Sequence, residues 1–183
     1  MKDSVCKDCA LGLFNDKCCN LEGVGNTQSG TMIVVPNVDY DAYKNKSMEF
    51  SNYVDILKSI LSSTGGIEQV FIVPLIRCKL NTKCPITPSI ARRCMLYTFR
   101  DIRIYNINKV MLLGDANKYM NFANAEKEAI HLVGKVGYSI SYSPFVKFKD
   151  DTKYNELCNH LIQWINANKD NNYNGMKIIR YDT

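Results

Sequence analysis

The sequence predicts an α/β protein, a three-layer α/β/α sandwich around a central, mainly parallel four-stranded sheet. Three observations favour this fold: short continuous apolar runs, amphipathic stretches with helical spacing, and the alternation of the two along the chain. Such apolar runs are typical of strands buried on both faces of a parallel sheet. Alternation with helices favours a sheet covered on both sides. We expect one domain over residues 1–183, long enough to bury a substantial core.

The four apolar runs are the expected strands. They cover residues 31–35, 70–76, 109–113 and 137–142. In open parallel sheets, ligands bind at the carboxyl ends of the strands. The sequence therefore predicts ligand-facing positions at four places, which are Pro36–Asp41, Arg77–Cys78, Gly114–Asp115 and Ser143–Pro144.

Helices are expected between these strands, over residues 48–62, 88–103, 115–131 and 151–168. Thr87 and Pro88 form a favourable N-cap and first-turn pair for the second of them. The first and the last of these helices each have an apolar stripe. The stripe of the first consists of Phe50, Val54, Leu57 and Leu61, and that of the last consists of Leu157, Leu161, Trp164 and Ile165. His131 and His160 fall on expected helices, so we expect them at the surface or partly buried and not in catalysis.

Composition restricts the class of protein. Hydrophobic residues make up 46% and charged residues 22%, which is ordinary for a globular chain. No apolar run reaches membrane-spanning length and no signal peptide is evident, so we expect no membrane association. We expect an intracellular protein, in the cytoplasm of a bacterium or of an infected host cell. The net charge of +5 and the pI of about 8.7 are compatible with a polyanionic partner.

Eight cysteines in an intracellular chain indicate metal or redox chemistry more than disulfides. Cys6 and Cys9 form a C-x2-C pair, and fifteen residues separate Cys78 from Cys94. Four thiolates suit zinc or an iron–sulfur cluster, and spacing alone does not separate the two. The remaining cysteines are expected to be small buried residues, namely Cys18, Cys19, Cys84 and Cys158.

This cysteine framework resembles that of the iron–sulfur (family 4) uracil-DNA glycosylases. The resembling segments extend over about residues 5–165 and comprise Cys6-Lys-Asp-Cys9, Gly23-Val-Gly25, Leu75-Ile-Arg-Cys78, Pro85, Pro88, Cys94 and Leu112-Leu-Gly114. The resemblance implies a uracil-DNA-glycosylase-like fold and a 4Fe–4S cluster held by the four cysteines. The alternative is a structural zinc site with the same ligands.

The catalytic motifs of that family are degenerate here. By resemblance, the base pocket would contain Phe50 as the stacking ring, with Pro74 and Ser143 at the positions of the uracil-reading asparagine and the histidine. Proline offers no side-chain amide and serine offers no cation. Phe50 has an ordinary alternative as a core residue of an amphipathic helix. We therefore expect no efficient uracil excision.

Three loop residues keep an enzymatic alternative open. Asn37 lies where related glycosylases have a water-positioning asparagine, and Asp39, with Asp41, could supply a carboxylate base. Solvated loop carboxylates and turn asparagines are the ordinary interpretation of such residues.

Basic residues suggest contact with phosphates. The candidates for DNA binding are Lys147 and Lys149, in the segment matching the family's DNA-intercalating loop, and Arg92 and Arg93. The overall expectation is a catalytically degenerate glycosylase-like protein that binds DNA or docks into a larger protein assembly. Composition and the lost catalytic residues suggest a viral replication or transcription assembly. The alternatives are an active glycosylase that uses Asn37 or Asp39 and a zinc-stapled interaction protein.

Overall fold

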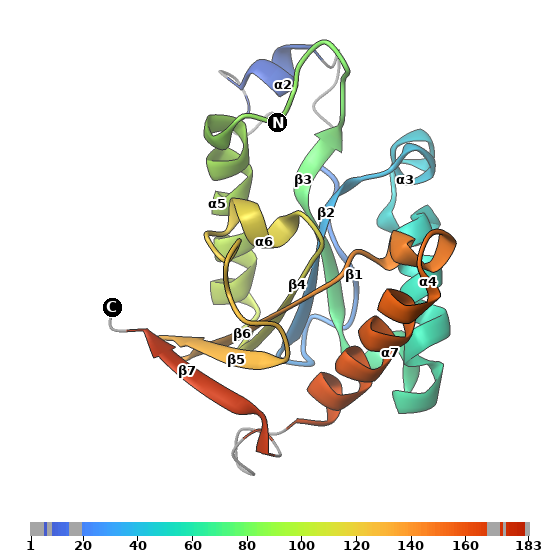
Figure 1. The fold of residues 1–183 in the computed structure, drawn as a ribbon. Coiled ribbons are helices and arrows are strands. Elements are labelled where there is room, and N and C mark those ends of the chain that lie inside the picture. Colours follow the sequence, from blue (N-terminus) through green and yellow to red (C-terminus); the bar gives the residue numbers. More distant parts are fainter. Residues whose placement is uncertain (1–5, 7–8, 15–19, 168–172, 174, 182–183) are drawn as a thin grey trace.

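The computed structural model describes residues 6, 9–14, 20–167, 173 and 175–181. These residues form an α/β protein whose strands make one mixed, mostly parallel sheet of seven strands in the order β1-β3-β2-β4-β6-β5-β7 (Figure 1). The strands are β1 (Val24–Gly25), β2 (Thr31–Val38), β3 (Phe71–Lys79), β4 (Lys109–Leu113), β5 (Ala129–Val133), β6 (Val136–Ser141) and β7 (Lys177–Tyr181).

The four predicted strands are the parallel centre of this sheet. β3, β2, β4 and β6 are neighbours in that order, and each adjacent pair is parallel. The predicted number of strands was wrong, because β1, β5 and β7 extend the sheet at its two edges. β1 has two residues, and β7 is largely exposed, so neither has the continuous apolar run of a doubly buried strand.

The prediction of a helix over residues 115–131 was also wrong. Only α6 (Ala116–Tyr119) is helical there, and the segment ends in strand β5. Asn121 and Glu128 have positive φ angles of 65° and 61°, which a right-handed helix does not accommodate. The apolar residues of β5 pair with β6 in an antiparallel arrangement instead.

The other predicted helices are present, with shifted ends. The helices are α2 (Ala10–Phe14), α3 (Tyr40–Asn45), α4 (Asn52–Leu61), α5 (Pro88–Ile104), α6 and α7 (Asp151–Asn166). Thr87 caps α5 as predicted, because its Oγ1 accepts a hydrogen bond of 3.3 Å from the backbone N–H of Ile90. Leu157, Leu161 and Trp164 are buried on α7, whereas Ile165 is only partly buried.

Helices cover both faces of the sheet (Figure 1). α4 and α7 bury their apolar stripes in one core, with Ile33 and Met111 of the sheet. Ile102 of α5 and Ala116 of α6 belong to a second core, with Val34 and Leu112. Alternate residues of a strand point to opposite faces, so β2 and β4 contribute to both cores.

None of the helices in the described part of the chain is long and apolar enough to cross a membrane.

Candidate functional site

Three of the four predicted ligand cysteines lie in one buried cluster. Cys9 precedes α2, Cys78 lies near the end of β3, and Cys94 lies on the inner side of α5. Their exposed fractions are 7%, 5% and 7%. Figure 1 shows why they meet, since α2 lies beside the upper end of β3 and next to α5. The packing therefore joins the start of the chain to two distant elements.

Cys6 belongs to the same region. Its Sγ lies 3.2 Å from the hydroxyl oxygen of Tyr97, one turn beyond Cys94 on α5. The pKa of the Cys94 thiol is raised to about 12, chiefly by burial and also by the nearby Cys78, Cys9 and Cys6. A hydrogen bond with the backbone of Arg77 acts in the opposite direction and favours the thiolate. All four predicted ligands are thus electrostatic neighbours.

The donors fit a tetrathiolate centre in chemical type. All four are free thiols, and a buried thiolate needs a cation or a metal beside it to be stable. As placed, however, no set of three or more His, Cys, Asp or Glu side chains among the described residues could hold a metal ion. The packing therefore brings the thiols into one region of the fold, but in the described part of the chain they are not arranged as a metal site.

The other cysteines differ in burial. Cys84 is buried, as expected, and packs in the same cluster as Cys9, Cys78 and Cys94. Cys158 on α7 is half-buried against the core between α4 and α7. Cys18 and Cys19 lie outside the described residues.

A buried ion pair lies beside the cysteines. Arg77 is 2% exposed, and its guanidinium donates to the carboxylate of Asp101 on α5. Tyr97 packs against the guanidinium groups of Arg77 and Arg100, with ring centroids 5.4 and 5.1 Å from their Cζ atoms. Sequence reasoning noted Arg77 but missed Asp101, because a carboxylate within an arginine-rich helix gives no local sign of burial.

Asn37 and Asp39 lie at and beyond the carboxyl end of β2. The amide of Asn37 donates to the backbone oxygen of Val38 at 3.0 Å. Asp39 accepts three hydrogen bonds, from the N–H of Ala42 at 3.0 Å, the hydroxyl of Ser51 at 2.7 Å and the N–H of Asn52 at 2.8 Å. Asp39 therefore caps α3 and ties it to the start of α4, which is a structural use of the carboxylate.

Asp41 is also engaged, because its carboxylate accepts a hydrogen bond of 2.9 Å from the side-chain amide of Asn52. Tyr53 is a residue of this edge that sequence reasoning missed. Burial, with smaller effects of Asp39 and Asp115, raises the pKa of its hydroxyl to about 12. Its ring packs against Phe145 at 4.4 Å between centroids, which connects α4 to the segment after β6.

The three base-pocket candidates differ in their surroundings. Phe50 lies on the short 3-10 helix η1 (Met48–Phe50) and is 54% exposed, so the alternative of a core position was wrong. Pro74 is buried in the interior of β3, opposite Val35. Ser143 caps the 3-10 helix η4 (Pro144–Phe148) through a hydrogen bond of 3.4 Å from the N–H of Phe145.

A close approach of two loops explains one glycine at this edge. A Cβ on Gly114, which has a φ of 55°, would lie 2.8 Å from the Cβ of Ser143. The turn after β4 therefore packs directly on the loop after β6, as expected where parallel strands end side by side.

The basic candidates occupy opposite sides of the sheet. Lys147 on η4 and Lys149 directly after it are exposed, and η4 packs with α4 and α7. Arg92 is exposed and Arg93 half-buried on α5, which covers the other face (Figure 1). They do not form one continuous patch.

The predicted exposure of the two histidines was wrong, and only His160 lies on a helix as predicted. His131 lies on β5, is fully buried, and contacts the Tyr181 hydroxyl at 2.9 Å and the backbone oxygen of Glu126 at 2.8 Å. His160 is buried on α7, with its Nε2 3.1 Å from the hydroxyl of Ser139. Burial lowers the pKa of His160 to about 4. Both rings have structural partners.

No protein-family model matches the chain, and no curated protein matches it. The class that the geometry defines is thus an α/β protein in which a buried group of free thiols joins the start of the chain to β3 and α5.

Proposed function

We propose that this protein is a catalytically degenerate, uracil-DNA-glycosylase-like protein in which Cys6, Cys9, Cys78 and Cys94 hold a 4Fe–4S cluster. The cluster has a structural role, and the domain serves as a DNA-binding or protein-docking accessory, in an assembly of the viral replication or transcription type. The observation that carries the proposal is the gathering of these thiols, which come from three separate stretches of the chain.

The surroundings of the thiols support a cluster with a structural role. A cluster ligated here would tie the N-terminal segment to β3 and α5, so its binding free energy would add to the folding free energy. The backbone hydrogen bond between Arg77 and the Cys94 sulfur is of the kind that tunes iron–sulfur centres. When bound, the cluster would supply four iron sites with thiolate ligands.

The engagement of Asp39 supports the absence of efficient base excision. A general base must reach a water or a proton of the substrate. The carboxylate of Asp39 instead accepts hydrogen bonds from three groups of its own fold, on Ala42, Ser51 and Asn52, which hold it in place. Ser143 likewise acts as a cap, and a neutral hydroxyl stabilises a departing uracil anion poorly compared with a cation.

Exposed aromatic and basic side chains at the carboxyl edge of the sheet support a nucleic-acid partner. Phe50 and Phe148 are 54% and 70% exposed, and Lys147 and Lys149 flank Phe148. Aromatic rings interleaved with cations are typical of surfaces that bind single strands. The resemblance also places a DNA-contacting loop in this segment.

The metal is tested first, in protein purified without oxygen. We expect visible thiolate-to-iron absorbance and about four iron and four sulfide per chain. Cys78→Ala should remove both, whereas Cys158→Ala should leave them unchanged. One zinc per chain without visible absorbance would favour the zinc-stapled alternative and contradict the cluster.

Activity is tested on single-stranded DNA that contains one uracil, at enzyme excess, with alkali to cleave abasic sites. We expect weak, salt-sensitive binding to this DNA and no strand breakage at the rate of active glycosylases. Strand breakage that disappears in Asn37→Ala or Asp39→Asn would show that the chain is an active glycosylase with a non-standard residue.

A further inference from the structure

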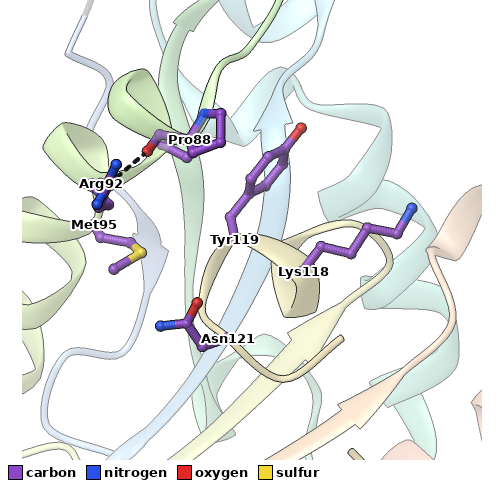
Figure 2. A pocket seen from close by; sticks show the side chains of 7 residues that line it. Pro88, Arg92, Met95, Lys118, Tyr119 and Asn121 are labelled. Carbon is purple, nitrogen blue, oxygen red and sulfur yellow. Dashed lines mark hydrogen bonds between the residues drawn. The ribbon is translucent and has the colours of Figure 1, made fainter. Parts of the chain in front are cut away.

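A groove runs along α5 on the face of the sheet opposite α4 and α7. Its first hollow, of about 510 Å³, lies between α5 and α6 and is shown in Figure 2. Arg92 and Met95 of α5 stand on one side, Lys118 and Tyr119 of α6 on the other, and Asn121 below them. The cysteine cluster lies next to this hollow, because Tyr119 packs partly against it.

Two further hollows continue the first. One of about 420 Å³ shares Lys118 and Asn121 with it and adds Asn124 and Tyr181. The next, of about 300 Å³, shares Asn121 and Tyr181 and ends at Phe99 of α5. Hollows of ~300–1,000 Å³ are the usual size of small-ligand sites, and the shared residues show that the three adjoin one another.

The exposed side of α5 carries a stripe of cations and apolar groups, of which Arg92 and Phe99 line the hollows. Arg92, Leu96, Phe99 and Arg103 are all exposed and follow one another at intervals of three or four residues, so they share one side of the helix. The helix contains four arginines, and Asp101, its single acidic residue, is buried in the pair with Arg77. This surface is therefore complementary to a polyanion.

The aromatic groups of the groove are held in place before any ligand binds. Phe122 stacks on Tyr138 at 5.2 Å between centroids and meets Tyr181 edge-on at 6.3 Å. The hydroxyl of Tyr181 is fixed by its contact with His131. Phe99 and Tyr181 are each 43% exposed, so their rings are partly open to a flat ligand.

We propose that this groove binds a short stretch of single-stranded nucleic acid. Arg92 and Lys118 contact phosphates, the rings of Phe99 and Tyr181 stack on unpaired bases, and the amides of Asn121 and Asn124 hydrogen-bond to base edges. This combination of a basic groove and stacking rings is how proteins hold single strands. Duplex bases are already stacked and paired, so they cannot use the rings. Lys118 forms an ion pair with Asp115 at 2.8 Å, and both side chains are exposed. On binding, the Lys118 ammonium leaves Asp115 and contacts the phosphate.

A peptide is the less favoured occupant, because Lys118, Asn121 and Asn124 interrupt the apolar lining that a helix-in-groove partner requires. This proposal does not rest on the function proposed above, which concerns the cysteines and the carboxyl edge of the sheet.

The experiment measures binding of the full-length protein to labelled ten-nucleotide oligo-dT, oligo-U and a duplex by fluorescence anisotropy. The NaCl concentration is varied from about 50 to about 200 mM, the range over which phosphate contacts make affinity depend strongly on salt. We expect binding to the single strands and weaker binding to the duplex. Whichever of oligo-dT and oligo-U binds with the higher affinity shows whether the groove prefers DNA or RNA.

Two variants separate the contributions. Arg92→Gln with Lys118→Gln should weaken binding roughly tenfold and lower the slope of log affinity against log salt by about 1.4, since each contact to a single strand contributes about 0.7. Phe99→Ser should weaken binding roughly tenfold without changing the slope. The matched control for the cations, on the opposite face, is Lys58→Gln with Lys153→Gln. Phe148→Ser tests the carboxyl edge of the sheet as the other surface that could bind the strand, and every variant is checked for folding by circular dichroism.

Three results would overturn the proposal. One is no binding of either single strand at protein concentrations up to about 100 µM, the weak end of non-specific affinity. Another is unchanged affinity for the single strands in both groove variants, which would show that the strand does not bind in the groove and would favour a peptide as its occupant. The third is loss of affinity in Phe148→Ser alone, which would place the strand at the carboxyl edge of the sheet.

Discussion

Single buried polar residues carry much of the specificity of this fold. Arg77 and Asp101 form an ion pair in which both side chains are at most 5% exposed. His160 is held neutral against Ser139 on the other face of the sheet. A buried charge or imidazole is tolerated only with a partner, so each of these residues makes its element depend on another.

Asp101→Asn should lower the free energy of unfolding by about 3–5 kcal/mol, because it leaves the buried Arg77 guanidinium without a counter-charge. Urea unfolding followed by circular dichroism measures the change. The control is Arg100→Gln, which removes the 41% exposed partner of the same carboxylate and should cost less than about 1 kcal/mol. Equal losses in the two variants would contradict the assignment of the buried pair.

His160 should make stability depend on pH in a defined window. Its pKa in the folded protein, about 4, lies below the ordinary value of 6.5. The unfolded chain therefore binds a proton first, so this contribution is complete above about pH 6.5 and is lost as pH falls toward 4. The shift corresponds to about 3 kcal/mol.

The measurement compares wild type with His160→Gln in urea at pH 7 and pH 4. The variant should lose less stability on acidification than the wild type does, by up to about 3 kcal/mol. Parallel losses in both proteins would show that other groups account for the acid sensitivity.

At the level of elements, α7 is attached to the sheet through its carboxyl end. The ammonium of Lys109, at the start of β4, donates to the backbone oxygens of Trp164, Ile165 and Ala167 at 2.7, 3.0 and 2.8 Å. A cation at this end also interacts favourably with the helix dipole. Burial opposes the charge and lowers the pKa of Lys109 to about 8, so the lysine is still mainly charged at pH 7.

Lys109→Met should therefore destabilise the protein at pH 7 by about 2 kcal/mol, because three carbonyl groups lose their donor in a buried site. Thermal unfolding by circular dichroism measures the change. Lys153→Met on the same helix removes an exposed ion pair with Asp150 and should change stability by no more than about 0.5 kcal/mol. A Lys109→Met protein as stable as Lys153→Met would contradict this role.

For the whole molecule, the thiols join the beginning of the chain to β3 and α5, and so to the wall of the groove. The inner side of α5 carries Cys94, Tyr97 and Asp101, while its outer side carries the arginine and phenylalanine stripe. The proposed cluster and the proposed single-strand groove thus share one helix, although neither proposal depends on the other.

Under the proposal of a 4Fe–4S cluster, Cys9→Ala or treatment with a chelator should lower the midpoint of thermal unfolding by several degrees, since a metal centre bound there would contribute directly to folding. Cys158→Ala, a half-buried thiol on α7, serves as the control and should unfold close to the wild-type temperature. A Cys9→Ala protein with the wild-type midpoint would argue against a structural role of the site.

Local sequence was sufficient for the centre of the fold. The runs that became β2, β3 and β4 are largely apolar over consecutive positions, which is typical of doubly buried strands of a parallel sheet, and the run of β6 is weaker because serines interrupt it. The start of α5 could also be predicted, because Thr87 accepts a hydrogen bond from the backbone amide of Ile90, only three residues away. These features depend on residues that are close in sequence, so they can be predicted without knowledge of the tertiary structure.

Long-range packing decided the rest. β5 exists as a strand because β6 and β7 lie on either side of it, and His131 is buried for the same reason. Asp39 caps α3 through the nearby Ala42, but its bonds to Ser51 and Asn52 form only because the turn into α4 brings those residues near it. The spacing of the cysteines indicated a set of ligands, but their meeting requires α2, β3 and α5 to pack together. Such contacts join residues far apart in sequence, and their free energy comes from burial that no local pattern records.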